Sequence, residues 1–174
     1  MKRTRTIALA LVLCLPTLPG MAERLAFNAE SGTITPPFVI TNGCLCQFTS
    51  TQPGRGGQAA YGFALTNAGD YGVLALVNTP GGRTNSLYIG IDVEPSEPKM
   101  CWDIPAASGF TYQTVFWREN DGSAAGPTRR KVFELKAGSH RLFVRGCAGN
   151  VQVRAFVVAP LPSPPTSLRI VSGP

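Results

Sequence analysis

The cysteines are the residues of this chain whose type and spacing point most directly to chemistry. There are five, at positions 14, 44, 46, 101 and 147. Cys44 and Cys46 stand one residue apart in the stretch TNGCLCQF (41–48). Such residues could ligate zinc, act as a redox pair or form disulfides, and the compartment decides among these uses. The spacing is not the C-x-x-C of redox pairs, which disfavours that use.

The first 22 residues have the pattern of a secretory signal peptide. Three basic residues, Lys2, Arg3 and Arg5, precede an apolar run over positions 7–15, and small residues precede a cleavage position after Ala22. The run is far shorter than the roughly 20 residues that span a bilayer. A retained anchor helix and a lipidated Cys14 are the alternatives. We expect a secreted or periplasmic protein that loses residues 1–22 and has no membrane span.

In an oxidising compartment the four remaining cysteines predict a disulfide framework. The segment after Gly43 is typical of extended chain. Cys44 and Cys46 would then point to one face with α-carbons about 6.5 Å apart, a poor geometry for a bond between them. We expect Cys44 and Cys46 each to pair with one of Cys101 and Cys147, in either connectivity. A zinc site made of four thiolates is the alternative.

Catalytic chemistry has little support in the sequence. The only histidine, His140, lies inside the strand-like SHRLFV, which favours a packed, hydrogen-bonded side chain over a general base. Glycoside hydrolysis needs two carboxyl groups about 5–10 Å apart, and nothing in the spacing brings Asp92 and Asp103 together. The glycine-rich PGRGGQ (53–58) precedes a strand, so it lacks the helix N-terminus that binds phosphate. We expect a protein that is not an enzyme and has no cofactor.

The charge of the chain gives no reason to expect a nucleic-acid partner. The chain has 16 basic and 10 acidic residues, and the leader contains three of the basic ones. The one basic cluster, TRRK (128–131), stands between a turn-like segment and the strand-like VFEL. That position is typical of a solvated strand edge.

Short β-type segments separated by turn residues predict an all-β fold, an antiparallel two-sheet β-sandwich of the jelly-roll type. In RLFVRG (141–146), Leu142 and Val144 alternate with Arg141, Phe143 and Arg145, as in a strand with one buried face. The nearly continuous apolar stretch 71–78 predicts a central strand buried on both faces. The predicted strands cover 25–30, 36–40, 59–66, 71–78, 86–92, 112–118, 131–135, 140–146 and 151–158.

Three parts of the chain follow from these patterns. Residues 1–22 are the signal peptide, residues 23–159 the β-sandwich, and residues 160–174 a proline-rich linker or tail. The tail contains PPTSLRIV, which resembles the first strand of a fibronectin type III domain. A frayed tail is the alternative.

Six segments, in this order, resemble carbohydrate-binding modules of families 6 and 35. The resemblance covers about 130 residues and implies a galactose-binding-like β-sandwich, usually a non-catalytic domain attached to a sugar-active enzyme. The segments are AFNAESGTI (26–34), AGDYGVLALV (68–77), NSLYIGID (85–92), FTYQTV (110–115), FELKAGSHRLFVRG (133–146) and GNVQVRAFVV (149–158).

The resemblance would imply a structural calcium ion, but the residues at the ion's ligand positions in this chain differ from those of the family. The family holds the ion with two acids in the opening strand and an Asp in the closing strand. Here those positions are Asn28, Glu30 and Arg154. Calcium takes six to eight oxygen ligands, so a cation in that shell opposes it. We expect no metal and, in its place, an ion pair between Glu30 and Arg154; a solvent-facing Arg154 is the alternative.

The resemblance also implies a sugar site in the loops at one end of the sandwich. The matching positions are Tyr61, Tyr112 and Asn150, with Trp102 and Phe110 as helpers. Aromatic faces stack on sugar C–H surfaces, and amides bind hydroxyls. Each aromatic residue has a core position as its alternative.

Two functions follow from the sequence. The first is a secreted, non-catalytic protein that binds a poly- or oligosaccharide through end loops. The second is an exported structural or protein-interaction β-sandwich without sugar binding. In both cases we expect a monomer, whose partner is a carbohydrate or an extracellular protein.

Overall fold

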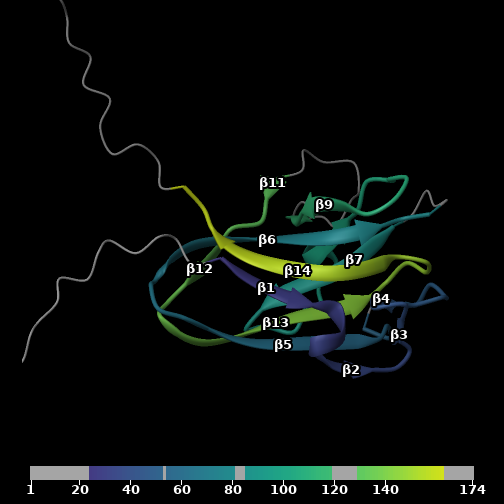
Figure 1. Cartoon of the computed structure of the whole chain (residues 1–174), viewed down its shortest axis with the longest axis horizontal. Helices are drawn as coiled ribbons and strands as arrows, with labels where there is room; N and C mark the ends of the chain where they lie inside the picture. The colour runs from purple at the N-terminus through teal and green to yellow at the C-terminus, as the bar shows by residue number, and fades with distance from the viewer. Residues whose placement is uncertain (1–23, 53, 81–84, 119–128, 163–174) are drawn as a thin grey trace, which may run out of the picture.

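The computed structural model of the chain describes residues 24–52, 54–80, 85–118 and 129–162. The predicted signal peptide, Cys14 and most of the predicted tail lie outside these residues. Strands dominate the fold (Figure 1), and no helix in the described ranges is long and apolar enough to cross a membrane. The two short 3-10 helices are η1 (Ala29–Ser31) and η2 (Pro98–Met100). The strands are β1 (Leu25–Asn28), β2 (Thr33–Thr35), β3 (Val39–Thr41), β4 (Cys44–Cys46), β5 (Gln58–Leu65), β6 (Gly69–Asn78), β7 (Ser86–Ile91), β8 (Cys101–Asp103), β9 (Thr111–Thr114), β10 (Phe116–Trp117), β11 (Arg129–Arg130), β12 (Phe133–Leu135), β13 (Gly138–Gly146) and β14 (Gln152–Pro160).

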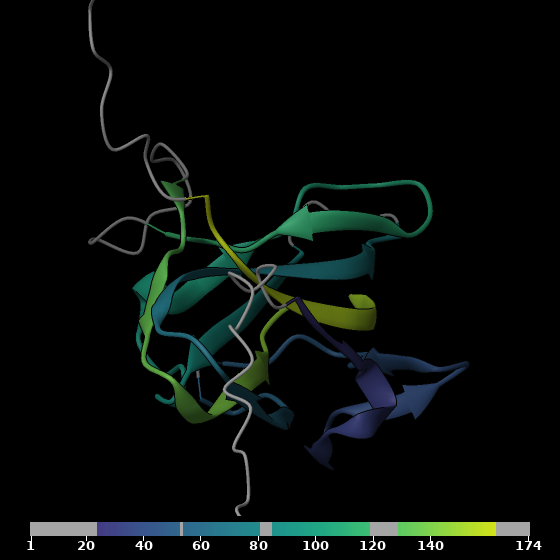
Figure 2. The ribbon, with the colours of Figure 1, turned by 60° about the vertical axis from the view of Figure 1, so that its left-hand side comes forward.

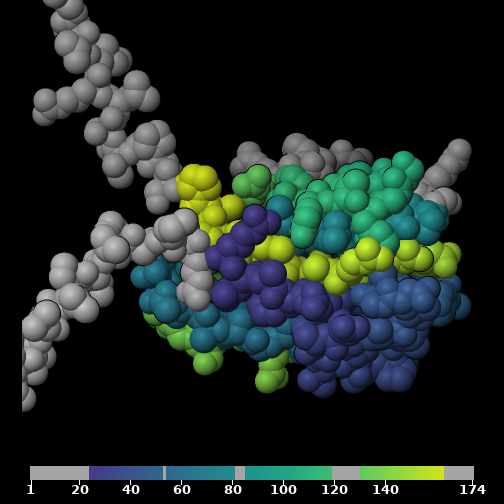
Figure 3. Space-filling model, in the orientation of Figure 1, coloured from purple at the N-terminus to yellow at the C-terminus, as the bar shows by residue number. Residues whose placement is uncertain are grey.

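The larger sheet, sheet A, has seven strands with β14 at its centre. Its order is β12-β6-β14-β4-β3, with β1 also paired to β14 and β9 also paired to β6. Figure 2 shows β14 (yellow) between β6 (teal) and the N-terminal strand β1 (purple). In Figure 3 the same strand forms a yellow band across the front of the molecule. The pairing of β14 with β6 contains a bulge between Val153 and Ala155, which makes Arg154 the extra residue.

The smaller sheet, sheet B, has five strands in the order β2-β5-β13-β7-β8. Strand β13 pairs with β5 along eight register positions and with β7 along five. A separate two-stranded sheet joins β10 and β11. All pairings are antiparallel, so the predicted two-sheet antiparallel sandwich is confirmed.

The core lies between the inner faces of the two sheets, where alternate residues of the long strands meet. Leu142 and Val144 are fully buried, whereas Arg141 is exposed and Phe143 half-buried, as the alternation predicted. The prediction for 71–78 is wrong in part. Strand β6 is central, but it alternates, with Val73 and Ala75 buried and Leu74 and Leu76 half-buried. Among the described strands, the six-residue β7 and the three-residue β4 are the ones buried along their whole length.

The stretch TNGCLCQF forms a tight hairpin. Thr41 pairs with Cys44 in register, so only Asn42 and Gly43 connect β3 to β4. Both have positive φ angles, 52° and 70°, the left-handed values that a two-residue hairpin turn requires and that Asn-Gly supplies at low cost. The turn therefore fixes Cys44 as the first residue of a strand.

Candidate functional site

Two of the predicted sugar-binding aromatic residues lie in the core, which corrects the prediction for both. Tyr61 is 2% exposed, and its hydroxyl donates to the Ala29 carbonyl oxygen at 2.7 Å. Its ring packs against Phe27 and Phe156, and burial raises its pKa above the ordinary value, so the hydroxyl stays a donor. Trp102 is fully buried in β8. Neither ring has a face available to a sugar.

Tyr112, in contrast, stands on the outer face of sheet A with 55% of its surface exposed. On β6, Leu76 faces Tyr112 of β9 on one side and Ala155 of β14 on the other. Residues at facing register positions share a face of the sheet. The neighbours of Leu76 along β6, Ala75 and Val77, are fully buried, so Tyr112 is directed away from the core.

Phe110 and Arg154 form a stacked pair on the edge of the same region. The Arg154 guanidinium lies 4.1 Å from the centroid of the Phe110 ring, within the range of a cation–π interaction. The predicted ion pair with Glu30 is therefore wrong. Strand β1 ends at Asn28, opposite Ala155, and the chain then enters η1, where Glu30 is exposed. Arg154 is the bulge residue of β14 and covers Phe110 instead.

An amide pair that the sequence analysis missed lies beside this stack. Asn78 of β6 and Gln152 of β14 are in register, and Asn78 Nδ2 donates to Gln152 Oε1 at 2.9 Å. The Gly109 backbone N–H donates to Asn78 Oδ1 at 3.3 Å, which ties the amide to the segment that leads into Phe110. Asn78 is two residues from Leu76, so the amides share the outer face with Tyr112.

Asn150, the predicted amide of the site, lies elsewhere. It is exposed with φ 65°, and its backbone N–H donates to the Gln47 carbonyl oxygen at 2.7 Å. This bond holds it on the β4 side of β14, whereas Tyr112 lies beyond β6 on the other side. The structure brings Phe110 and Tyr112 to one region but not Asn150, whose place is taken by Gln152 in the same segment.

The residues at the family's calcium position do not fit the ion. Arg154 is a cation, and its guanidinium is stacked on Phe110. Asn28 is the last residue of β1 and pairs in register with Ala155 rather than with Arg154. In the described part of the chain, no group of three or more His, Cys, Asp or Glu residues is close enough to hold a metal.

The cysteines lie in two separate places, and the predicted cross-pairing is wrong. All four in the described residues are free thiols. Leu45 of β4 is in the core, so the thiols of Cys44 and Cys46 point to the opposite side of sheet A. Cys101 begins β8 in sheet B, and its thiol contacts Cys147 instead. A four-thiolate zinc site is therefore not formed either.

The acids and the histidine that could suggest catalysis are each paired. His140 Nδ1 lies 2.6 Å from Asp92 Oδ2, and Arg118 binds both carboxylate oxygens of Asp103 at 2.6 and 2.7 Å. Asp103 pairs with the first residue of β7, and Asp92 follows its last residue. Six residues of strand place the two acids about 20 Å apart, well beyond the separation for glycoside hydrolysis.

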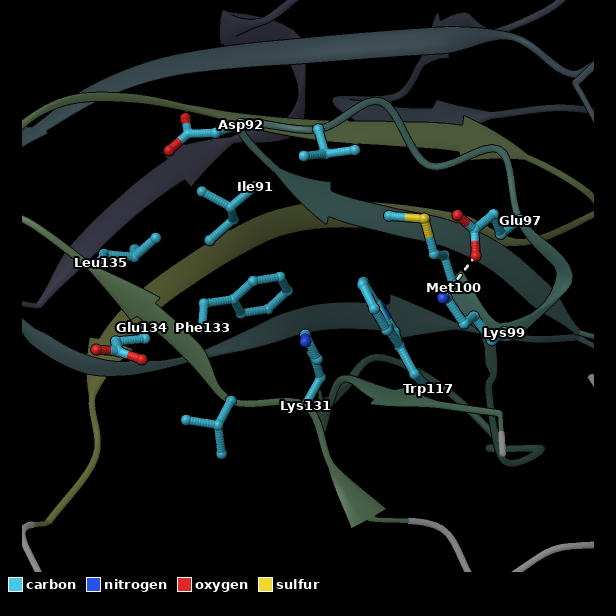
Figure 4. Close-up of a pocket in the computed structure, with 12 residues that line it drawn as sticks. Ile91, Asp92, Glu97, Lys99, Met100, Trp117, Lys131, Phe133, Glu134 and Leu135 are labelled. Atoms are coloured by element: carbon cyan, nitrogen blue, oxygen red, sulfur yellow. Dashed lines mark ion pairs between the residues drawn. The ribbon is translucent and has the colours of Figure 1, made fainter. Parts of the chain in front are cut away.

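A groove of about 620 Å³ lies away from the Tyr112 region, between the end of β7, η2, β10 and β12 (Figure 4). Its aromatic surface is already covered. Lys131 Nζ lies 4.0 Å from the Trp117 ring centroid, and the Trp117 indole N–H donates to the Ile89 carbonyl oxygen at 2.9 Å. Burial and the nearby Lys99 lower the pKa of Lys131. The groove thus offers charged groups but no open aromatic platform.

Comparison with known proteins finds the likeness at the level of structure. No protein-family model and no curated protein sequence matches the chain. Among solved structures, a family 35 carbohydrate-binding module from Clostridium thermocellum is 13% identical, with a TM-score of 0.55 over 80% of this chain and 100% of that one. The GH26-CBM35 β-(1,4)-mannanase of Podospora anserina is 12% identical, with a TM-score of 0.56 over 82% of this chain and 29% of that one.

A third structure agrees with these two. The exo-β-1,3-galactanase of Phanerochaete chrysosporium is 15% identical, with a TM-score of 0.52 over 80% of this chain and 30% of that one. The chain thus spans less than a third of either enzyme and the whole of the Clostridium module. The described β-sandwich has the fold of a family 35 carbohydrate-binding module.

Proposed function

We propose that this chain is an exported, non-catalytic protein that binds a polysaccharide through the outer face of sheet A. The site is the Tyr112 face, made of Tyr112, the Phe110–Arg154 stack, and the amides of Asn78 and Gln152. The observation that carries the proposal is the 55% exposed ring of Tyr112 beside that amide pair.

The chemistry of the Tyr112 face suits a sugar. A tyrosine ring stacks on the C–H surface of a pyranose, and a carboxamide has both donors and acceptors for hydroxyl groups. The cation–π contact holds the Arg154 guanidinium in place, so its donors lose less conformational freedom on binding. The site is an open face rather than a pocket, which suits a chain-like ligand.

The structural neighbours support this ligand class. Two of them are enzymes named for β-(1,4)-mannan and β-1,3-galactan, and a third is a separate family 35 module. We infer that the ligand is a poly- or oligosaccharide, and soluble β-mannan, β-1,3-galactan and dextran are the first probes. The protein acts alone or docked to an enzyme.

Affinity electrophoresis in gels that contain soluble polysaccharides tests the proposal, together with a glycan array. We expect retardation in at least one polysaccharide, loss of retardation in Tyr112→Ala and retention of it in Tyr112→Phe, which keeps the ring. Phe48→Ala is the matched control because Phe48 is also an exposed aromatic residue, 62% exposed, and lies two residues after β4, away from the Tyr112 face and the groove. Failure to bind any plant, algal or bacterial polysaccharide would overturn the proposal.

The groove in Figure 4 is the alternative location for the sugar site, and a substitution there distinguishes it from the Tyr112 face. Lys131→Ala uncovers Trp117 and should leave sugar binding unchanged. If Lys131→Ala alters binding and Tyr112→Ala does not, the sugar site is the groove and not the Tyr112 face.

A protein-interaction role is the second candidate, and one feature favours it. The edge strand β3 exposes Val39 and Ile40 by 40% and 39%, and Phe48, two residues after β4, is 62% exposed. An exposed apolar edge strand is a site where another chain can add a strand. Loss of self-association or partner binding in Ile40→Lys, with no sugar binding in the unmodified protein, would favour this role.

A further inference from the structure

We propose that Cys101 and Cys147 form a disulfide bond that joins the edge strand β8 to the end of β13. The two residues lie on either side of β7. Cys101 pairs in register with Tyr88 of β7, and Cys147 follows Gly146, which pairs with Leu87. The Ala148 backbone N–H donates to the Ser86 carbonyl oxygen at 3.1 Å, which holds the segment around Cys147 against the same stretch of β7.

The two thiols are in contact inside a small cluster of buried side chains. Tyr88, Met100 and Cys101 form this cluster, and Cys147 and Trp117 pack against it. The side chains of Cys101, Ser86 and Tyr88 lie close enough to the Cys147 sulfur to favour its thiolate form.

The thiols differ in exposure and in acidity, which gives the oxidation an order. Cys101 is fully buried, whereas Cys147 is half-buried and open to a reagent. The hydrogen bond from the Cys101 thiol, and after it those from Ser86 and Tyr88 with the Arg118 charge, lower the pKa of Cys147 to about 6 against the opposing effect of burial. The same contact and burial raise the pKa of Cys101. Cys147 is therefore the attacking sulfur near neutral pH.

The reaction needs a disulfide oxidant, such as oxidised glutathione or an extracytoplasmic dithiol oxidase. The Cys147 thiolate attacks one sulfur of the oxidant, forming a mixed disulfide and releasing one thiolate. The Cys101 thiol then loses its proton and attacks the Cys147 sulfur, which forms the protein disulfide and releases the second thiolate. The two protein thiols are oxidised by two electrons, and the oxidant is reduced to two thiols.

Cys44 and Cys46 do not enter this reaction. Both are 4% exposed, and their thiols donate to the backbone carbonyl oxygens of Asn42 and Cys44 at 3.6 and 3.7 Å. Burial, and then the neighbouring Cys44, raise the pKa of Cys46. They should stay reduced while the Cys101–Cys147 pair oxidises.

Tryptic peptide mapping tests the connectivity directly, because the basic residues separate the cysteines. Cleavage places Cys44 and Cys46 in peptide 25–55, Cys101 in peptide 100–118 and Cys147 in peptide 146–154. The folded chain is equilibrated with oxidised and reduced glutathione, denatured in acid, alkylated and digested without reductant. We expect peptides 100–118 and 146–154 to be linked and peptide 25–55 to be alkylated twice.

Two results would overturn the proposal: alkylated Cys101 and Cys147 after oxidation, or a link from either of them to peptide 25–55. Thermal unfolding gives an independent readout. Oxidation should raise the Tm of the unmodified protein by about 5–15 °C, as expected for a disulfide that closes a loop of this size in a domain of this length. This rise should vanish in the Cys101→Ser/Cys147→Ser double variant. The matched control, Cys44→Ser/Cys46→Ser, should keep it, and a rise that vanishes in the control alone would contradict the assignment.

Discussion

His140 Nδ1 lies 2.6 Å from Asp92 Oδ2, and the opposite ring nitrogen, Nε2, lies 2.8 Å from the Lys136 carbonyl oxygen. Both partners can only accept hydrogen bonds, so the ring satisfies both when each nitrogen carries a proton. Burial lowers the pKa of His140, but the bonds to Asp92 and Lys136 outweigh it and the net shift is upward. The pair joins the end of β7 to β13.

This arrangement predicts a stability that depends on pH. Because the pKa of His140 is raised in the folded state, its contribution is fully present below about pH 6.5 and is lost as the pH rises through the folded pKa. The difference in free energy of unfolding between the unmodified protein and His140→Gln should therefore shrink as the pH rises above about 6.5. Urea unfolding at several pH values measures it, and Asp92→Asn should weaken the dependence. A difference that grows with pH would contradict the assignment.

The Arg154–Phe110 stack predicts a binding effect that depends on the proposed function. Arg154→Ala removes both the guanidinium donors and the contact that holds Phe110. We expect a roughly two- to five-fold weaker affinity for the polysaccharide, the equivalent of one exposed cation–π contact. Isothermal titration of Arg154→Ala and Arg154→Lys measures it, and Lys should retain part of the affinity. Unchanged or tighter binding in Arg154→Ala would mean that Arg154 only covers Phe110.

The core position of Tyr61 predicts an effect on stability rather than on binding. Tyr61→Phe leaves the Ala29 carbonyl oxygen without its buried donor, which costs about 1–2 kcal/mol of the free energy of unfolding. Tyr112→Phe is the matched control, and its loss should be near zero because the ring is on the surface. Chemical denaturation of the two variants side by side decides. Equal losses of the free energy of unfolding in the two variants would contradict the buried position of Tyr61 and the exposed position of Tyr112.

The close contact between Gln47 and Gly146 predicts that substitutions at the two positions have coupled effects on the free energy of unfolding. Gln47 is 1% exposed; its Oε1 accepts from the Gly57 N–H at 2.8 Å, and its Nε2 donates to the Thr49 carbonyl oxygen at 2.8 Å. A Cβ at Gly146 would lie 2.0 Å from that Oε1, so Gly146→Ala must displace the amide. We expect Gly146→Ala and Gln47→Ala each to cost about 2–3 kcal/mol.

The double variant Gly146→Ala/Gln47→Ala tests this coupling. Its cost should be smaller than the sum of the two single costs, because both changes break the same bonds. Denaturant unfolding of all three variants provides the comparison. Full additivity would show that the alanine at position 146 acts on something other than the amide.

The sequence was sufficient for what depends on local pattern. The alternation in RLFVRG predicted which residues of β13 are buried, and the Asn-Gly pair fits the tight turn before β4. It was not sufficient for Tyr61 and Trp102, because a strand residue and a sugar-stacking residue have the same aromatic type. Their burial depends on which strands face each other across the sandwich.

The pairwise predictions failed for a related reason. The predicted Glu30–Arg154 pair required a continuous β1 next to an unbulged β14, and neither η1 nor the bulge has a sequence signal that we used. The cysteine pairing depended on the sheet to which each strand belongs: β4 is in sheet A and β8 in sheet B. The contribution of Gln152 depended on the register of β14 with β6. The only sequence signal for Gln152 was that the GNVQVR segment contains an amide side chain at that position.

The position of β14 has a consequence for the order of folding. This strand, the last one in the described residues, is the element through which β1 and β4 are connected to β6 within sheet A. Before residues 152–160 are available, sheet A consists of three unconnected pieces, namely β12-β6-β9, the β3-β4 hairpin and β1, each with unpaired backbone groups. Sheet B has no such requirement, because β5, β7 and β13 all precede β14. We therefore expect sheet B to be able to assemble around β13 first and sheet A to close when β14 is added, so a chain shortened before Gln152 should keep the strands of sheet B and still fail to form a sandwich.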